Sequence, residues 1–263
     1  MGEGRGAYQT IGEKRMNASR TIAVATGKPG MSADRKAALW VGVLFIIGTV
    51  GMVLSTVVTT AILSGSAYLA QVAAEPNRVA LGALLLLVAG LALALVPVVF
   101  WPIGKRYNET LAVGYVVFRG AIETIFYIVT ALGWLLLIAL SKEADAGPLA
   151  NFVRTTETVI WDQLIAIPFV LGALMFYVVL YQSRLVPRWL STWGLVGAVL
   201  YIVAPLGSMF ELSLGFFMAP LALQEMVMAI WLIAKGFNPS AIAPESAGEM
   251  SMRRAAASTA PAT

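Results

Sequence analysis

The sequence predicts an all-α integral membrane protein, a six-transmembrane-helix bundle with both termini cytoplasmic. The first observation is composition: 59% of the 263 residues are hydrophobic and 12% are charged, whereas a soluble domain has about 45–50% apolar and about 25% charged residues. So many apolar side chains must face lipid or one another, in spans of about 20 residues. The other observations are six apolar segments of that length and an uneven distribution of basic residues between them.

Each of the six segments exceeds the length of about 18 residues that favours a membrane-spanning helix. Proline occurs inside several of them, which is tolerated in lipid because neighbouring helices can satisfy the freed backbone groups. The third segment is unusually long, and it carries Arg119 and Glu123 within an otherwise apolar run. We expect the spans at residues 37–63, 79–103, 111–140, 159–181, 190–209 and 212–234.

The two longer loops between spans contain helix signals of their own. The loop after the first span reads AYLAQVAAEPNR, which predicts a short surface helix that ends at Pro76. The loop after the third span is expected to resume a helix around Pro148 and to lead into the fourth span. Asp162 and Gln163 then fall near the mouth of that span, where we interpret them as a solvated helix start.

The ends of the chain have a different composition from the spans. Residues 1–35 are rich in glycine and polar residues, and residues 238–263 are rich in Ala, Pro and Ser. Segments of this kind bury too little apolar surface to fold. We therefore predict a disordered cytoplasmic N-terminal arm at 1–35, a six-helix transmembrane domain at 36–237 and a disordered cytoplasmic tail at 238–263.

Lysine and arginine are distributed unevenly between the two sides that these spans define. Fourteen lie on the side of the termini and three on the other, and Arg119 lies within a span, which accounts for all 18. Cytoplasmic loops carry the excess of Lys and Arg in membrane proteins. The count therefore places both termini in the cytoplasm, and because the basic residues follow topology we expect no nucleic-acid partner.

Three charged residues within the spans are the candidates for function. Arg119 and Glu123 are four residues apart and share one helix face. At 1.5 Å per residue they lie about 12 and 18 Å from the cytoplasmic end of the third span, and Glu225 lies about 15 Å into the sixth. Because a charge facing lipid is costly, we predict that the three side chains meet inside the bundle. Nearby polar residues that we expect to complete their hydrogen bonds are Gln224, Tyr115, Tyr127, Thr124 and Thr130.

The predicted cluster has two interpretations. One cation and two carboxylates give a formal charge of −1, which suits a site that handles a proton or binds a cationic ligand. Alternatively, the three charges stay paired and hold the third and sixth helices together in register. Both interpretations remain open at this point.

Several chemistries are excluded by the residues that the chain lacks. The 263 residues contain no Cys and no His, which removes disulfides, iron–sulfur clusters, thiolate or imidazole zinc sites and Ser-His-Asp triads. Phosphate-binding and dinucleotide-binding glycine motifs are also missing from the sequence. We expect no cofactor, no metal and no catalytic residue, and an enzyme is disfavoured because neither a nucleophile nor a metal set accompanies the carboxylates.

Three segments carry a family resemblance: FRGAIE at 118–123, SRLVPRWLSTWGLVGA at 183–198 and LALQEMVMAIWLIAKGFN at 221–238. They resemble the bacterial six-span membrane proteins catalogued as domain of unknown function 4386. The resemblance implies a multi-pass helical bundle in the bacterial cell inner membrane, with N and C termini cytoplasmic, and it implies no substrate. Four of the residues selected above fall within these segments: Arg119, Glu123, Gln224 and Glu225.

Two classes of function follow. The first is a small transporter or ligand-binding bundle that uses the Arg/Glu cluster, with Arg119, Glu123, Gln224, Glu225, Tyr115 and Tyr127 as its binding residues. The alternative is a non-catalytic structural subunit or assembly factor of a membrane protein complex. The expected partners are the lipid bilayer and either other membrane proteins or further copies of the chain. A passage that reaches Glu123 favours the first class, and a sealed cluster favours the second.

Overall fold

The computed structural model describes residues 31–242, and the chain divides into two units, Met1–Lys36 and Ala37–Thr263. In the first unit, the Arg35 amide donates to Ser32 Oγ at 3.2 Å, which caps the first described helix. The expectations for residues 1–30 and 243–263 lie outside the described residues.

Between residues 31 and 242 the regular secondary structure is helical, and six helical stretches are long and apolar enough to cross a membrane. This confirms the number of spans and their order. A short helix, α3 (Tyr68–Ala74), lies between the first two. The six stretches are α2 (Ala33–Leu63), α4 (Pro76–Gly104), α5–η1–α6 (Glu109–Tyr115, Val116–Ile122, Glu123–Leu140), α7–η2–α8 (Gly147–Val159, Ile160–Leu164, Ala166–Ser183), α9–α10 (Arg188–Tyr201, Val203–Ser208) and η3–α11 (Gly215–Met218, Ala219–Ala234).

The boundaries differ from prediction mainly in the loops. The short helix α3 is present as expected, but Pro76 begins the next helix, where its missing N–H is not needed. Helix α7 resumes at Gly147, next to Pro148, and continues through η2 into α8. The interpretation of Asp162 as a helix start is therefore wrong, because Asp162 lies inside a continuous helical stretch.

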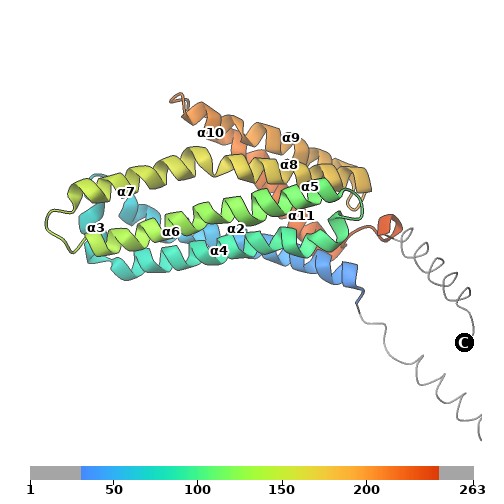
Figure 1. Cartoon of the computed structure of the whole chain (residues 1–263), viewed down its shortest axis with the longest axis horizontal. Helices are drawn as coiled ribbons and strands as arrows, with labels where there is room; N and C mark the ends of the chain where they lie inside the picture. Colours follow the sequence, from blue (N-terminus) through green and yellow to red (C-terminus); the bar gives the residue numbers. More distant parts are fainter. Residues whose placement is uncertain (1–30, 243–263) are drawn as a thin grey trace, which may run out of the picture. The chain divides into compact units, whose positions relative to one another are not determined.

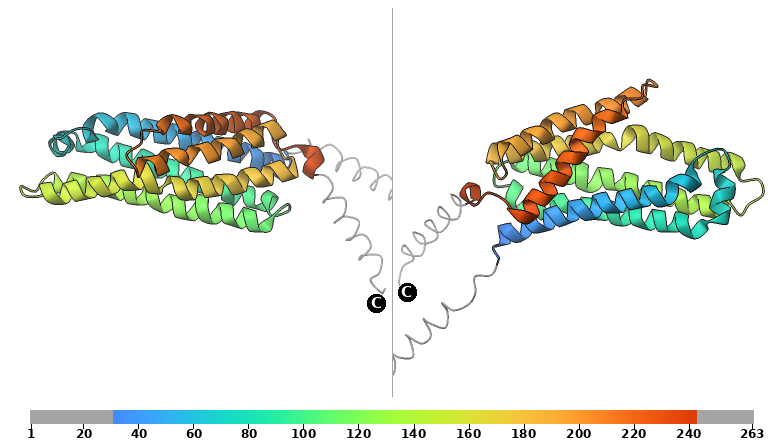
Figure 2. Two further views of the ribbon diagram at one scale, coloured as in Figure 1. Left: turned by 90° about the horizontal axis from the view of Figure 1, so that it is seen from above. Right: turned by 180° about the vertical axis from the view of Figure 1, so that it is seen from behind.

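The helices of the second unit lie side by side, and α11 crosses them obliquely (Figures 1 and 2). Helix α4 lies against α6, α8 lies against α5 and α9, and α9 lies against α11. Helix α2 contacts α11 at Gly42, where an added Cβ would lie 2.6 Å from the Ala229 carbonyl oxygen. The third, fourth and sixth stretches are thereby brought around a common interior, where the candidate residues lie.

The interior and the outer face of this unit are both apolar. Rings pack tightly inside, and the Phe176 ring lies 4.9 Å from Phe100 and 4.8 Å from Tyr115 between centroids. On the outside, large apolar side chains such as Leu132 and Ile230 are about 60% exposed. An outer face of this kind is suited to lipid, so the polar residues that are buried inside require a separate explanation.

Candidate functional site

Arg119, Glu123 and Glu225, which we term the ion cluster, lie together in the interior. Arg119 Nη1 is 3.2 Å from Glu123 Oε2, and Arg119 Nη2 is 3.5 Å from Glu225 Oε1. The Arg119 and Glu123 side chains are 3% and 1% exposed, and that of Glu225 is 13% exposed. One guanidinium therefore faces two carboxylates from two different spans, and Glu225 is the more accessible of the pair.

Aromatic side chains complete the surroundings of the cluster. The Arg119 guanidinium lies 4.4 Å from the Phe169 ring centroid, close enough for a cation–π interaction. The Tyr127 hydroxyl donates to Glu123 Oε1 at 2.9 Å. Arg119 Nε is buried without a hydrogen-bond partner among the described residues. The guanidinium is thus held by both carboxylates and a ring, while one of its N–H groups stays unsatisfied in the structure.

The backbone departs from a regular α-helix next to this cluster. In η1 the Glu123 amide donates to the Phe118 carbonyl, five residues earlier, so Arg119 lies within a π-helical segment. The second π-helical segment, η2, is closed by a bond from the Ile165 amide to the Ile160 carbonyl at 2.9 Å. Short π-helical segments occur frequently at functional sites. Both of these segments contribute side chains to one cavity.

That cavity, which we term the main cavity, has a volume of about 790 Å³. Its walls are mostly apolar. Four charged residues line them: the three of the ion cluster and Asp162 of η2. It reaches the turn between α10 and η3, at Leu212 and Ser213, which are exposed. The residues that line it include Met52, Thr56, Leu93, Arg119, Glu123, Tyr127, Trp161, Asp162, Phe169, Tyr201, Ser208, Met218 and Glu225.

Two glycines allow the helices to approach closely enough to build the cluster. A Cβ on Gly172 of α8 would lie 3.0 Å from Arg119 Cβ and 3.1 Å from the Arg119 amide nitrogen. A Cβ on Gly90 of α4 would lie 2.8 Å from the Tyr127 side chain. Larger residues at either position would push away the helix that carries the cluster.

The other predicted site residues have different surroundings. Gln224 is fully buried, but its amide donates to the Leu190 carbonyl at 3.0 Å and accepts from the Tyr177 hydroxyl at 2.5 Å. Tyr115 stacks on Phe176, and its hydroxyl has no hydrogen-bond partner within residues 31–242. The expectation that both would hydrogen-bond to the cluster is therefore wrong, whereas Tyr127 does so.

The two threonines expected at the cluster also form no hydrogen bond to it. The Thr124 hydroxyl donates to the Gly120 carbonyl on its own helix at 2.8 Å. Thr130 is buried, and its hydroxyl finds no partner in the described part of the chain. Neither residue bonds to the three charged side chains.

Most residues that line the main cavity were not selected from the sequence, and three of these are Phe169, Trp161 and Asp162. Phe169 faces the guanidinium, and Trp161 and Asp162 lie on η2. Asp162 could have been selected from the sequence, because an acidic residue so close to an apolar run is unusual. Its place on the cavity wall, however, depends on the π-helical turn. Within residues 31–242 no group of three or more acidic side chains is arranged to hold a metal ion.

The fold and the site together define a six-span helical membrane protein whose buried charges border an internal cavity. The chain belongs to the family described as Domain of unknown function (DUF4386), whose model matches residues 40–236. This confirms the resemblance in the three sequence segments, and the match contains all of the predicted site residues. No match was found among the curated proteins or the solved structures.

Proposed function

We propose that this protein binds a small, mainly apolar molecule with one cationic group in the main cavity. The observation that carries the proposal is the position of two carboxylates and one guanidinium on the wall of an otherwise largely apolar cavity. Ligand pockets of proteins are typically about 300–1,000 Å³, mostly apolar, with a few placed polar groups. A cavity of about 790 Å³ falls within that range.

The charge of the cluster selects the charge of the ligand. Arg119 already faces both carboxylates and the Phe169 ring, so its positive charge is well compensated. The three groups together carry a formal charge of −1. A cation beside Glu225, which is the partly exposed carboxylate, makes the site neutral, whereas an anion would add a second uncompensated negative charge.

The cavity also supports a binding function over a purely structural one. An ion cluster that only fixes helix register needs no cavity beside it, and tightly packed side chains around the charges would serve that role better. Here the cavity reaches both Arg119 and Glu123. This favours the small transporter or ligand-binding class over the structural subunit or assembly factor.

Matched probes test the proposal directly. We expect 1-adamantylamine, a rigid apolar cage with one ammonium group, to bind the purified chain in nanodiscs more tightly than 1-adamantanol or adamantane-1-carboxylate. Glu225→Gln should weaken binding of the amine about 10- to 100-fold, since a hydrogen bond to a charged group contributes about 1.5–3 kcal/mol. Isothermal titration calorimetry measures these affinities.

The control is Glu143→Gln, which removes an exposed carboxylate that does not line the main cavity. It should leave the affinity for 1-adamantylamine unchanged. Equal binding of the amine and the carboxylate, or equal affinity in the wild type and Glu225→Gln with both folded, would contradict the proposal. If Glu225→Gln does not fold, Glu123→Gln replaces it.

We also propose the bacterial inner membrane as the location, with both termini cytoplasmic. The support is the count of fourteen basic residues on the side of the termini against three on the other. Family membership supports a membrane protein of this class. In this orientation the turn between α10 and η3, which the main cavity reaches, faces away from the cytoplasm.

A further inference from the structure

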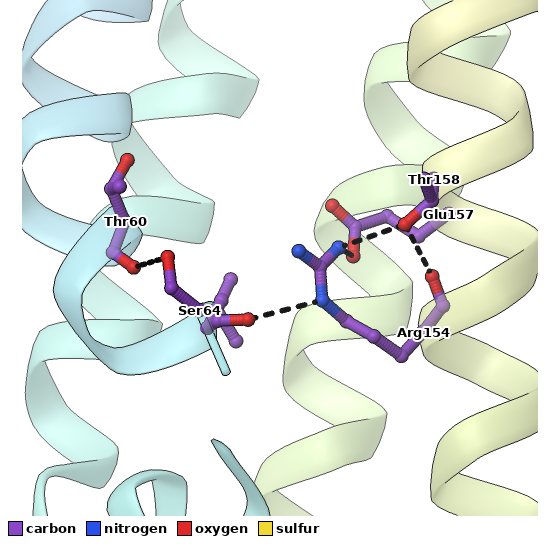
Figure 3. Close-up of polar contacts among 6 residues, drawn as sticks. Thr60, Ser64, Arg154, Glu157 and Thr158 are labelled. Carbon is purple, nitrogen blue, oxygen red and sulfur yellow. Dashed lines mark hydrogen bonds and ion pairs between the residues drawn. The ribbon is translucent and has the colours of Figure 1, made fainter. Parts of the chain in front are cut away.

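A second cavity lies beside the main cavity, toward the end of α2 and around α7. Its volume is about 220 Å³, and we term it the hydroxyl pocket. Figure 3 shows Arg154 of α7 extending toward the end of α2, where Thr60 lies in the last turn and Ser64 follows the helix. The pocket is lined by Ser55, Thr56, Thr59, Thr60, Leu63, Ser64, Leu86, Trp134, Arg154, Glu157, Thr158, Trp161 and Asp162.

The positive charge in this pocket is already engaged. Arg154 Nη1 forms an ion pair with Glu157 and lies 3.4 Å from Thr158 Oγ1. Arg154 Nε donates to the Leu63 carbonyl oxygen at 3.4 Å. The guanidinium therefore ties α7 to the end of α2, and the carboxylate of Glu157 compensates its charge.

The hydroxyl groups of α2 have also used their donors. Each threonine hydroxyl donates to the backbone carbonyl four residues earlier. The distances are 3.0 Å from Thr56 to Met52, 2.8 Å from Thr59 to Ser55 and 2.7 Å from Thr60 to Thr56. Each hydroxyl oxygen keeps lone pairs that can accept a hydrogen bond. With the carboxylates of Glu157 and Asp162, the pocket presents mainly acceptors and suits a cation or a hydrogen-bond donor.

The hydroxyl pocket and the main cavity share part of their walls. Thr56 of α2 and both Trp161 and Asp162 of η2 line the two spaces. Along α2 the lining continues from Leu63 to Met52, about 17 Å at 1.5 Å per residue. The two spaces therefore adjoin at Thr56, Trp161 and Asp162, and hydroxyl groups of α2 line the hydroxyl pocket up to this boundary.

We infer that the hydroxyl pocket is the access site through which a small organic cation reaches the ion cluster. This inference rests on the proposed function and adds the route by which the ligand arrives. Acceptor oxygens along the wall attract the cationic group, and Asp162 stands where the two spaces meet. A negatively lined approach concentrates cations and excludes anions of similar size.

Thiol labelling tests the access site, because the 263 residues contain no native cysteine. Thr60→Cys places one thiol in the hydroxyl pocket, and Leu132→Cys places one on the apolar outer face, outside both cavities. The full chain in nanodiscs is reacted with cationic trimethylammonium-ethyl and anionic sulfonatoethyl methanethiosulfonates. Each rate is divided by the rate of the same reagent with 2-mercaptoethanol, which removes the intrinsic difference between the reagents.

We expect the normalised rate at Thr60→Cys to be at least about tenfold higher for the cationic reagent than for the anionic one. Adding Asp162→Asn should reduce that preference, whereas Asp145→Asn, which removes an exposed carboxylate outside both cavities, should not. Leu132→Cys should react with neither reagent. Thr56→Cys serves as a second reporter if Thr60→Cys does not fold.

The outcomes separate this inference from the proposed function. Equal normalised rates for both reagents at Thr60→Cys, or no effect of Asp162→Asn, overturn the access site even when 1-adamantylamine binds as expected. A cationic preference at Thr60→Cys without any binding of 1-adamantylamine supports a cation-selective pocket and overturns the proposed function. Protection of Thr56→Cys by 1-adamantylamine supports both.

Discussion

Replacing Arg119 by methionine should destabilise the protein strongly, because it leaves two buried carboxylates without their cation. At the observed separations of 3.2 and 3.5 Å, each attraction is about 5 kcal/mol at an effective dielectric constant of about 20. The variant no longer buries a guanidinium, which offsets part of this loss. Breaking a buried ion pair in this way typically costs about 3–5 kcal/mol, and we expect a value in that range.

The comparison within the chain is the Glu75–Arg78 pair. Its atoms lie closer, at 2.6 Å, but its side chains are 45% and 46% exposed. Exposed pairs contribute about 0–1 kcal/mol because water screens them. Arg78→Met should therefore change the free energy of unfolding much less than Arg119→Met, although its ion pair is the shorter one.

A compensated variant makes the reasoning refutable. Combining Arg119→Met with Glu123→Gln and Glu225→Gln removes all three charges and keeps an acceptor for the Tyr127 hydroxyl. We expect this triple variant to recover most of the lost stability. The assay is equilibrium unfolding by SDS in dodecyl maltoside micelles, followed by tryptophan fluorescence and far-ultraviolet circular dichroism. A loss at Arg119→Met no larger than at Arg78→Met, or a triple variant as unstable as the single one, would refute it.

Two further substitutions test the packing around the site. Gly172→Ala should cost about 1–3 kcal/mol by overpacking against Arg119, while Gly147→Ala, whose Cβ meets nothing within 4 Å, should be nearly neutral; thermal unfolding of the purified variants measures both. Gln224→Leu should cost about 1–3 kcal/mol through its lost buried hydrogen bonds without weakening 1-adamantylamine binding. Glu225→Gln, one residue along, should weaken 1-adamantylamine binding, which Gln224→Leu should not, and calorimetry on the two folded variants measures this difference.

The spans could be predicted from sequence because lipid imposes a simple length and composition on them. All six were found, and the errors lie where tertiary contacts decide the structure. The helix around Pro148 and the apolar run from residue 159 were both expected, but Asp162 was interpreted as a helix start. In the structure Asp162 lies inside the continuous stretch Gly147–Ser183, because η2 joins α7 to α8. Local hydropathy does not reveal a π-helical segment of this kind.

The ion cluster could also be predicted in part from sequence, because lipid constrains where charges can lie. Burying charges in a span is costly unless they meet, so Arg119, Glu123 and Glu225 were selected by their sign and depth alone. Gln224 was misassigned because adjacent residues on a helix point in different directions, and depth does not distinguish them. The π-helical segments depend on packing between helices, so no residue type in the sequence indicates them. The main cavity could not be predicted either, because it depends on both segments.

Three departures from a regular, close-packed bundle coincide at one place in this protein. Charges are buried at the ion cluster, the backbone is π-helical at both η1 and η2, and a cavity opens between them. Each departure is unfavourable for stability when taken alone. A bundle that needed only to remain folded would have no reason to place all three together. Their coincidence supports the binding function proposed above, since violations of local rules in natural proteins are concentrated at functional sites.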